Sequence, residues 1–247
     1  MRIAIISDVH ANIDALRAVF AQIDTQGVDL LACLGDVVGY GGDPPSSCTL
    51  IRERAAWPVL GNHDAAVAER MNYDYYYSSA RDALDLHRTQ LDEENLHWLK
   101  NIPWTVRTDG MQLSHGRPDA PEAFEYMFNQ THTQALLEAY EGLEAVNFIG
   151  HSHLTHAYRF ERGAEAEAQD VSGRVIHLDP DAKYVITVGS VGQPRDHDPR
   201  ACYVIYDREA ATVEYFRVRY DVRAAAMRIW NQEGLSPEFA KRLYLGV

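Results

Sequence analysis

An α/β fold with parallel strands is predicted for this chain of 247 residues. Two features of its N-terminal quarter support the prediction. Short apolar runs alternate with stretches of helical periodicity, and polar side chains follow directly after each apolar run. Alternation of strand and helix is typical of layered α/β proteins whose strands run parallel.

The first elements follow from local sequence patterns. Residues 2–6, RIAII, are apolar and short enough for a buried strand. Apolar side chains then recur at helical spacing from Ile13 to Ile23, with Asn12 as the expected N-cap and Gly27 as the expected stop. The next elements are a strand over 28–34, a helix over 44–55 and a short strand over 57–60 that contains Pro58.

The sequence pattern changes from residue 65 onward. Residues 65–103 are predicted to form a helical insertion, and residues 104–220 a strand-rich second half. Asp-Gly at 109–110 lies between two strand-like runs, which is the signal of a β-hairpin. From Val222 a helical tail is expected. Since no repeat or linker interrupts the chain, one domain is predicted over 1–247.

Charge and composition exclude several classes of function. A net charge of −13 disfavours binding to a nucleic-acid polymer. The sequence contains no run of about 18 uncharged apolar residues, so no membrane span is predicted. Cys33, Cys48 and Cys202 are odd in number and widely spaced, which favours the cytoplasm over a disulfide-stabilised or zinc-cysteine protein. The charged stretch 161–170 is expected to be a solvated turn.

Polar side chains that bind metals or catalyse reactions gather just after the apolar runs. The carboxyl ends of strands in an open α/β sheet share one edge, where ligands bind. Residues that are far apart in sequence are therefore expected to converge on one site. In chain order they are Asp8, His10, Asp36, Asn62, His63, Asp64, His115, His151 and His153.

These side chains are a mixed set of carboxylate, amide and imidazole groups. Such a set suits Mn, Fe, Zn or Ni better than Ca or Mg, which prefer oxygen ligands alone. The ligands are too many for one ion. Two ions about 3.5–4 Å apart need a group between them, and a carboxylate can provide it. Two divalent metal ions are therefore the expected cofactors.

Five short motifs in this order resemble the calcineurin-like metallophosphoesterases: DVH, GD, GNHD, SHG and GHSH. The stretch GSVGQPRDHDPRACYVIYD, 189–207, resembles the small bacterial and archaeal branch of that superfamily. The resemblance implies a four-layer α-β-β-α sandwich of two mixed sheets flanked by helices. It also implies an active site at the carboxyl ends of the strands.

The resemblance also implies a role for each residue. A metal-bridging hydroxide would attack phosphorus in line with the leaving oxygen. His63 would face the substrate as an acid or a charge stabiliser, with Asp64 orienting its ring. Asp8, His10 and His153 would hold one metal, Asn62, His115 and His151 the other, and Asp36 would bridge them.

A small phosphorylated molecule or nucleotide is the expected substrate, hydrolysed as a phosphomonoester. The stretch after Asp36 lacks the Asp-Arg pair of the protein Ser/Thr phosphatases, and Asp64 stands where those enzymes typically have Glu. The alternatives are a phosphodiesterase, a dinucleoside-polyphosphate hydrolase, a protein Ser/Thr phosphatase, and a metal-binding interaction module without catalysis. No membrane partner is expected, and the oligomeric state stays open.

Three further features carry two interpretations each. Arg195 either contacts the substrate phosphate or pairs with a neighbouring aspartate. The tyrosine-rich run 72–79 is either a platform for a nucleotide base or packing within a lid helix. His156 follows the GHSH motif and is expected to support the site from outside or to be structural, whereas the role of His197 stays open.

Overall fold

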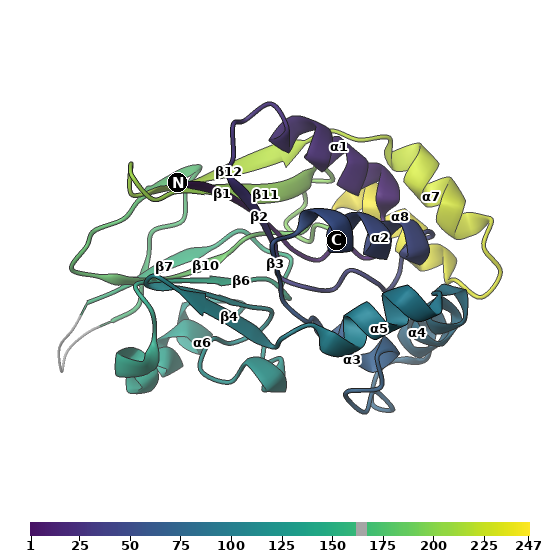
Figure 1. Ribbon diagram of the computed structural model, residues 1–247, viewed down its shortest axis with the longest axis horizontal. Coiled ribbons are helices and arrows are strands. Elements are labelled where there is room, and N and C mark those ends of the chain that lie inside the picture. Colours follow the sequence, from purple (N-terminus) through teal and green to yellow (C-terminus); the bar gives the residue numbers. More distant parts are fainter. Residues whose placement is uncertain (162–166) are drawn as a thin grey trace.

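Two six-stranded sheets lie face to face in the computed structural model, which describes residues 1–161 and 167–247 (Figure 1). In spatial order the first sheet consists of β3 (Trp57–Pro58), β2 (Leu30–Cys33), β1 (Arg2–Ile6), β11 (Ala201–Asp207), β12 (Thr212–Val218) and β9 (Val175–His177). The second consists of β4 (Thr105–Thr108), β5 (Met111–Ser114), β6 (Val146–Ile149), β10 (Lys183–Thr187), β7 (Ala157–Phe160) and β8 (Gln169–Asp170). Both sheets are mixed, because β1 is parallel to β2 but antiparallel to β11, and β10 is parallel to β6 but antiparallel to β7. The predicted sandwich is therefore confirmed.

Helices flank both sheets. On the side of the first sheet lie α1 (Ile13–Ile23), α2 (Pro44–Arg54), α7 (Val222–Trp230) and α8 (Pro237–Leu245), and on the side of the second lies α6 (Gln130–Gln134) (Figure 1). The other helices are α3 (Asn62–Val67), α4 (Ser78–Gln90), α5 (Glu93–Asn101) and the 3₁₀ segments η1 (Pro121–Ala123) and η2 (Ala135–Gly142). Among the described residues, no helix is long and apolar enough to cross a membrane.

The alternation of side chains along β1 divides the core into layers. Ile3 and Ile5 pack with Phe148 of the other sheet, whereas Ala4 and Ile6 belong to the core cluster that contains the apolar face of α1. Successive side chains of a strand point to opposite faces, so one five-residue run serves both layers. All four residues are buried completely, which explains why the run is apolar throughout.

Several boundaries differ from the sequence predictions. Helix α1 is capped by Asn12, whose side chain accepts a hydrogen bond from the backbone N–H of Ala15, but it ends at Ile23, and Gly27 lies in the turn beyond. The strand predicted over 57–60 pairs for only two residues. The N–H of Leu60 donates to the carbonyl of Pro103, so the chain has left the sheet there.

The helical prediction over 65–103 is correct only in part. Residues 68–77 separate α3 from α4, and all the tyrosines of the run 72–79 lie in this connection instead of in a lid helix. The side chain of Asn72 accepts a hydrogen bond from the N–H of Asp74 at 2.7 Å, a local contact that favours a turn over a helix. The tyrosines therefore do not lie in a lid helix, although Tyr73 and Tyr76 do pack against the core.

The predicted hairpin is confirmed. Strands β4 and β5 pair antiparallel, and Asp109 and Gly110 between them both have positive φ, as a two-residue type I′ turn requires. The turn expected over 161–170 falls partly outside the described residues, at 162–166. Its end forms the short strand β8.

Candidate metal centre

The predicted site residues all lie where the parallel strands of the two sheets end. The connections after these strands are tied to one another by backbone hydrogen bonds. The N–H of His10, after β1, donates to the carbonyl of Asp36, after β2, at 2.8 Å. In the second sheet the N–H of Gly150, after β6, donates to the carbonyl of His115, after β5, at 3.0 Å. Across the sheets, the N–H of His151 donates to Oδ2 of Asp8 at 3.1 Å, so residues from both sheets meet at one edge of the sandwich.

The backbone is strained at these positions. Non-glycine residues rarely adopt the left-handed region, and each that does costs about 1–3 kcal/mol unless its surroundings enforce it. Such strain gathers at functional sites. Five of the predicted residues have φ between 46° and 66°, namely Asp8, His10, Asp36, His151 and His153.

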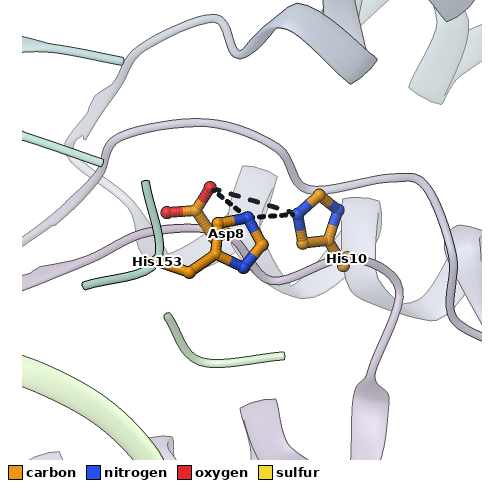
Figure 2. Close-up of side chains that lie close together, drawn as sticks. All are labelled: Asp8, His10 and His153. Carbon is orange, nitrogen blue, oxygen red and sulfur yellow. Dashed lines mark hydrogen bonds and ion pairs between the residues drawn. The ribbon is translucent and has the colours of Figure 1, made fainter. Parts of the chain in front are cut away.

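The first group consists of Asp8, His10 and His153, all buried (Figure 2). The Nε2 atoms of the two histidines are 3.1 Å apart. Oδ1 of Asp8 lies 3.3 Å from Nε2 of His153 and 4.0 Å from Nε2 of His10. Three potential ligand atoms thus face one another in a space closed to solvent.

Backbone carbonyls determine which nitrogen each ring presents. Nδ1 of His10 contacts the carbonyl oxygen of Val38 at 3.1 Å, and Nδ1 of His153 contacts that of Gln193 at 2.5 Å. A carbonyl only accepts, so both rings donate from Nδ1. Burial lowers the pKa of both imidazoles well below the usual value, so each is neutral and has its lone pair on Nε2.

Two lone pairs 3.1 Å apart repel unless a cation lies between them. Oδ1 of Asp8 adds to this mismatch, because it is buried and has no hydrogen-bond partner among the described residues. Buried polar atoms are almost always satisfied, so an orphan of this kind indicates an absent ligand. The atoms of Asp8, His10 and His153 therefore fit a divalent cation.

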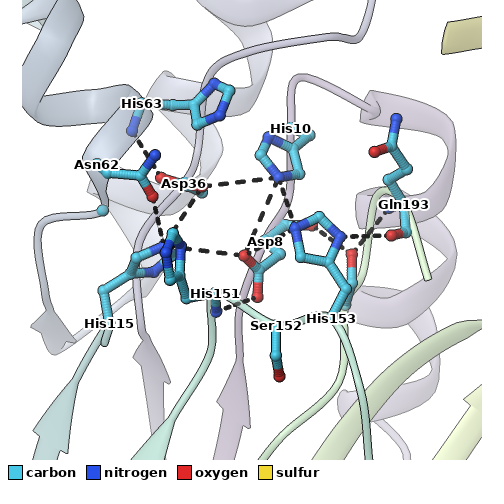
Figure 3. A network of polar contacts seen from close by, with 12 residues as sticks. Asp8, His10, Asp36, Asn62, His63, His115, His151, Ser152, His153 and Gln193 are labelled. Carbon is cyan, nitrogen blue, oxygen red and sulfur yellow. Dashed lines mark hydrogen bonds and ion pairs between the residues drawn. The ribbon is translucent and has the colours of Figure 1, made fainter. Parts of the chain in front are cut away.

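The second group is centred on His115 (Figure 3). Its Nδ1 contacts the carbonyl oxygen of Leu34 at 2.6 Å, which turns Nε2 inward. Nε2 lies 3.0 Å from Oδ1 of Asn62 and 3.1 Å from Nδ1 of His151. The amide of Asn62 donates to the hydroxyl of Tyr76 at 2.5 Å, so its oxygen points toward the group.

Asp36 lies between the two groups (Figure 3). Its Oδ2 is 3.7 Å from Nε2 of His10 and 3.3 Å from Nε2 of His115. Burial opposes its ionisation, but the charges of His115 and His63 outweigh burial and hold its pKa well below the usual value. Burial likewise opposes protonation of His115, and Asp36 nevertheless raises its pKa to about 9. Without a cation, a proton on His115 thus neutralises part of the local negative charge.

Asp64 does not orient the ring of His63, contrary to the sequence expectation. Its two carboxylate oxygens accept backbone hydrogen bonds, from Val38 at 3.1 Å and from Gly61 at 3.2 Å. Nδ1 of His63 is buried without a hydrogen-bond partner among the described residues. The Asp64 carboxylate instead joins the loop after β2 to the start of α3.

Aromatic packing and a close glycine hold His63. Its ring lies edge-on to Tyr40, with centroids 4.6 Å apart, and tilted to Tyr76 at 5.8 Å. Gly39 has φ of +95°, and a Cβ there would lie 2.2 Å from Nδ1 of His63. Gly61 makes a similarly close approach, since a Cβ would lie 2.1 Å from the backbone nitrogen of Asp36.

The residues that fix the ligands from outside were not predicted from the sequence. Tyr76 holds the Asn62 amide, and the Gln193 carbonyl holds His153. Tyr76 belongs to the tyrosine-rich run and Gln193 to the motif stretch 189–207, so the sequence draws attention to both segments. It does not indicate which ligand each residue contacts. His87 is buried and bonded through both ring nitrogens to Gly39 and Gly41.

Arg195 lies beside the metal centre. Its charge acts on Asp8, His10 and Tyr126, and its guanidinium donates to Oε1 of Gln193 at 3.2 Å. The adjacent aspartates pair with other arginines: Asp196 with Arg217 and Asp198 with Arg200. His156 and His197 belong to none of the candidate ligand groups among the described residues.

Comparison with known proteins gives the family of the chain. The family model of the calcineurin-like phosphoesterase superfamily domain matches residues 1–211. The chain belongs to the calcineurin-like phosphoesterase superfamily. It is 35% identical over 248 residues to an uncharacterized protein of Methanocaldococcus jannaschii, an alignment that covers 99% of this chain and 98% of that protein.

Two solved structures share the whole architecture of this chain. A metallophosphoesterase from Sphaerobacter thermophilus has a TM-score of 0.84 and 35% identity, covering 100% of this chain and 99% of that one. A hypothetical protein from Pyrococcus horikoshii has a TM-score of 0.78 at 17% identity, covering 100% and 98%, and therefore shows the shared fold alone. The chain is a metal-dependent phosphoric ester hydrolase of this superfamily, and the family implies divalent metals.

Proposed function

We propose that this phosphoesterase is dinuclear and hydrolyses the phosphate monoester of a small molecule in the cytoplasm. The observation that supports it most is the pair of neutral imidazole nitrogens of His10 and His153, 3.1 Å apart beside the unpartnered oxygen of Asp8. Asp8, His10 and His153 would hold one ion, Asn62, His115 and His151 the other, and Asp36 would contact both.

Two divalent ions, when bound, supply positive charge for the phosphoryl oxygens and lower the pKa of a bound water from about 16 to about 7. The side chains of the chain itself do the rest. His63 lines the cavity beside the metal centre and would protonate the leaving oxygen or stabilise its developing charge. Burial lowers the pKa of His63 to about 4, opposed by Asp36, so the ring needs the charge of bound substrate to hold a proton at neutral pH.

Arg195 is proposed to bind a phosphoryl oxygen. Its two neighbouring aspartates pair with other arginines, so neither of them neutralises its guanidinium, which donates to Gln193. A guanidinium matches the geometry of phosphate oxygens and gives a charge-assisted hydrogen bond. Arg195 would thus orient the substrate while the metal ligands position its phosphorus.

Turnover by metal-stripped protein tests the proposal. p-Nitrophenyl phosphate and bis-p-nitrophenyl phosphate are compared after Mn, Ni, Fe or Zn is added back singly. We expect metal-dependent hydrolysis with preference for the monoester, and two ions per chain by elemental analysis. His10→Ala should lose metal, whereas His97→Ala, at an exposed histidine on α5, should not. Preference for the diester would make the chain a phosphodiesterase, and no turnover of either ester would contradict the proposal.

A further inference from the structure

A cavity of about 580 Å³ opens beside the candidate metal centre. Asn62, His63 and His151 line one part of it, so it shares residues with the metal cluster. Small-molecule sites typically have volumes of about 300–1,000 Å³, so this cavity can hold a substrate of nucleotide size. Most of its other lining side chains are aromatic: Tyr40, Tyr75, Tyr76, Tyr77, Phe124, Tyr126 and Phe128.

Two segments far apart in sequence provide exposed aromatic rings to this cavity. Tyr75 and Tyr77, before α4, have exposed fractions of 73% and 50%. Tyr126 and Phe128, between η1 and α6, are each 41% exposed. Nine large hydrophobic side chains are exposed among the described residues, and these four all line the one cavity. Such clustering marks a binding surface, since scattered exposed rings need no explanation.

The rings of one segment form a flat stack that begins at the metal cluster. Tyr126 is parallel to His151 within 16°, with centroids 3.7 Å apart. Phe128 is parallel to Tyr126 within 13°, with centroids 4.5 Å apart. A planar group that lies against this segment would therefore be held at a fixed orientation to a predicted metal ligand.

We propose that the cavity binds the nucleobase of a nucleoside phosphate, whose phosphoryl group then reaches the metal centre. Every base has a π-face, and stacking on an aromatic side chain is favourable whatever the base. Glu125 and His132 also line the cavity and provide polar atoms for the edge of a base. This inference deepens the proposed function and rests on it for the position of the phosphate.

Comparing an ester with and without a base tests the inference. Adenosine 5′-monophosphate and ribose 5-phosphate carry the same ester, and only the first carries a base. We expect kcat/KM to be at least about fivefold higher for the nucleotide, the lower end of the effect of one stacked base. Equal values for the two esters would overturn the inference while leaving the phosphoesterase intact.

Two substitutions at exposed rings assign the effect to this cavity. Phe128→Leu and Tyr75→Leu keep apolar bulk but remove the flat ring, and each should reduce the ratio of nucleotide to ribose phosphate turnover. Tyr244→Leu is the matched control, because Tyr244 is 45% exposed, stacks on Trp230 and lies outside the cavity lining. A ratio unchanged in both cavity variants would overturn the inference.

A binding measurement separates the inference from the proposed function. Adenosine and ribose lack phosphate, so calorimetric titration of the metal-stripped protein needs neither ions nor turnover. We expect adenosine to bind more tightly than ribose, and Phe128→Leu to remove most of that difference. If no ester is hydrolysed with any metal but adenosine binds in this way, the proposed function fails and the base site stands. If esters are hydrolysed and adenosine binds no better than ribose, the base site fails.

Discussion

Three imidazoles of the metal centre face inward with the nitrogen that a backbone carbonyl leaves free. Nδ1 of His10 donates to the carbonyl of Val38. In the same way, His115 donates to Leu34 and His153 to Gln193. Such outer contacts orient ligands and raise their basicity. Carbonyls cannot rotate away, so this orientation is part of the fold.

The position of Asp36 between the two groups leads to the first prediction. Asp36→Asn replaces a charged oxygen with an amide nitrogen or a neutral oxygen, while the shape of the side chain is almost unchanged. We expect the variant to bind fewer than two ions per chain and to lose most of its activity, because Oδ2 of Asp36 lies nearer than Oδ1 of Asp8 to the Nε2 atoms of both His10 and His115. Metal content by elemental analysis and turnover of p-nitrophenyl phosphate measure both effects. Two ions and full turnover would show that Asp36 is not the bridge.

Asn62 and His63 are neighbours whose variants should fail in different ways. Asn62→Ala removes an oxygen that points at His115, so metal affinity should fall. His63→Ala should keep both metals while kcat falls by about 10²–10⁴-fold, the usual contribution of a positioned acid or base. The loss should shrink for a good leaving group such as p-nitrophenolate, which needs little protonation.

The pattern of losses distinguishes the roles of His63. Equal losses on good and poor leaving groups would assign it to stabilising phosphoryl charge. Loss of metal from His63→Ala would show that His63 is a ligand. Its ring lies close enough to His10 and Asp36 to hold an ion with them, so this outcome has to be tested. Asp64→Ala should act differently from either, through the loop at Val38 that its carboxylate holds.

At the scale of elements, helix α4 clamps the glycine-rich loop that follows β2. His87 accepts the N–H of Gly39 at Nδ1, at 3.0 Å, and donates from Nε2 to the carbonyl of Gly41, at 2.9 Å. Nδ1 can accept only in the neutral ring, whereas the bond from Nε2 to Gly41 forms in either protonation state. The clamp holds Gly39 against His63, so a helix remote in sequence fixes a residue of the site.

This clamp should make stability depend on pH. Burial lowers the pKa of His87 from 6.5 to about 4, although its bond to Gly41 opposes the shift. Below pH 6.5 the unfolded chain therefore binds a proton that the folded chain excludes, and stability falls as pH decreases toward 4. Lowering the pH from 7 to 5 should reduce the free energy of unfolding by about 2 kcal/mol through this one group.

Urea unfolding of metal-stripped protein at several pH values measures the effect. The buried histidines of the metal centre also titrate, so the comparison with His87→Gln isolates this group. The variant should be less stable at pH 7, because its clamp is imperfect, and its free energy of unfolding should fall less between pH 7 and 5. Parallel pH profiles for the two proteins would contradict the assignment.

At the scale of the whole molecule, local sequence patterns determine where helices and strands form, whereas contacts between distant residues depend on the folded chain. The apolar run 2–6 and the capped helix at Asn12 are local signals, and both were predictable. The convergence of ligands was predictable too, because strand ends share an edge. The partners of Asp64 and Tyr76 were not, since Val38 and Asn62 meet them only after the chain has folded. Likewise, nothing in the sequence indicates that His87 reaches the loop of Gly39.

The net charge of −13 predicts how the molecule treats substrates of different charge. An acidic phosphopeptide carries negative charge beyond its phosphate and is repelled over a long range, whereas a small ester carries charge only where the metals compensate it. We expect a higher kcat/KM for small esters and nucleotides than for acidic phosphoserine peptides. Added salt should narrow the gap, since screening weakens repulsion between exposed charges. A panel with a basic phosphopeptide as control, at low and high ionic strength, measures this, and clear preference for phosphoserine peptides at low salt would overturn it.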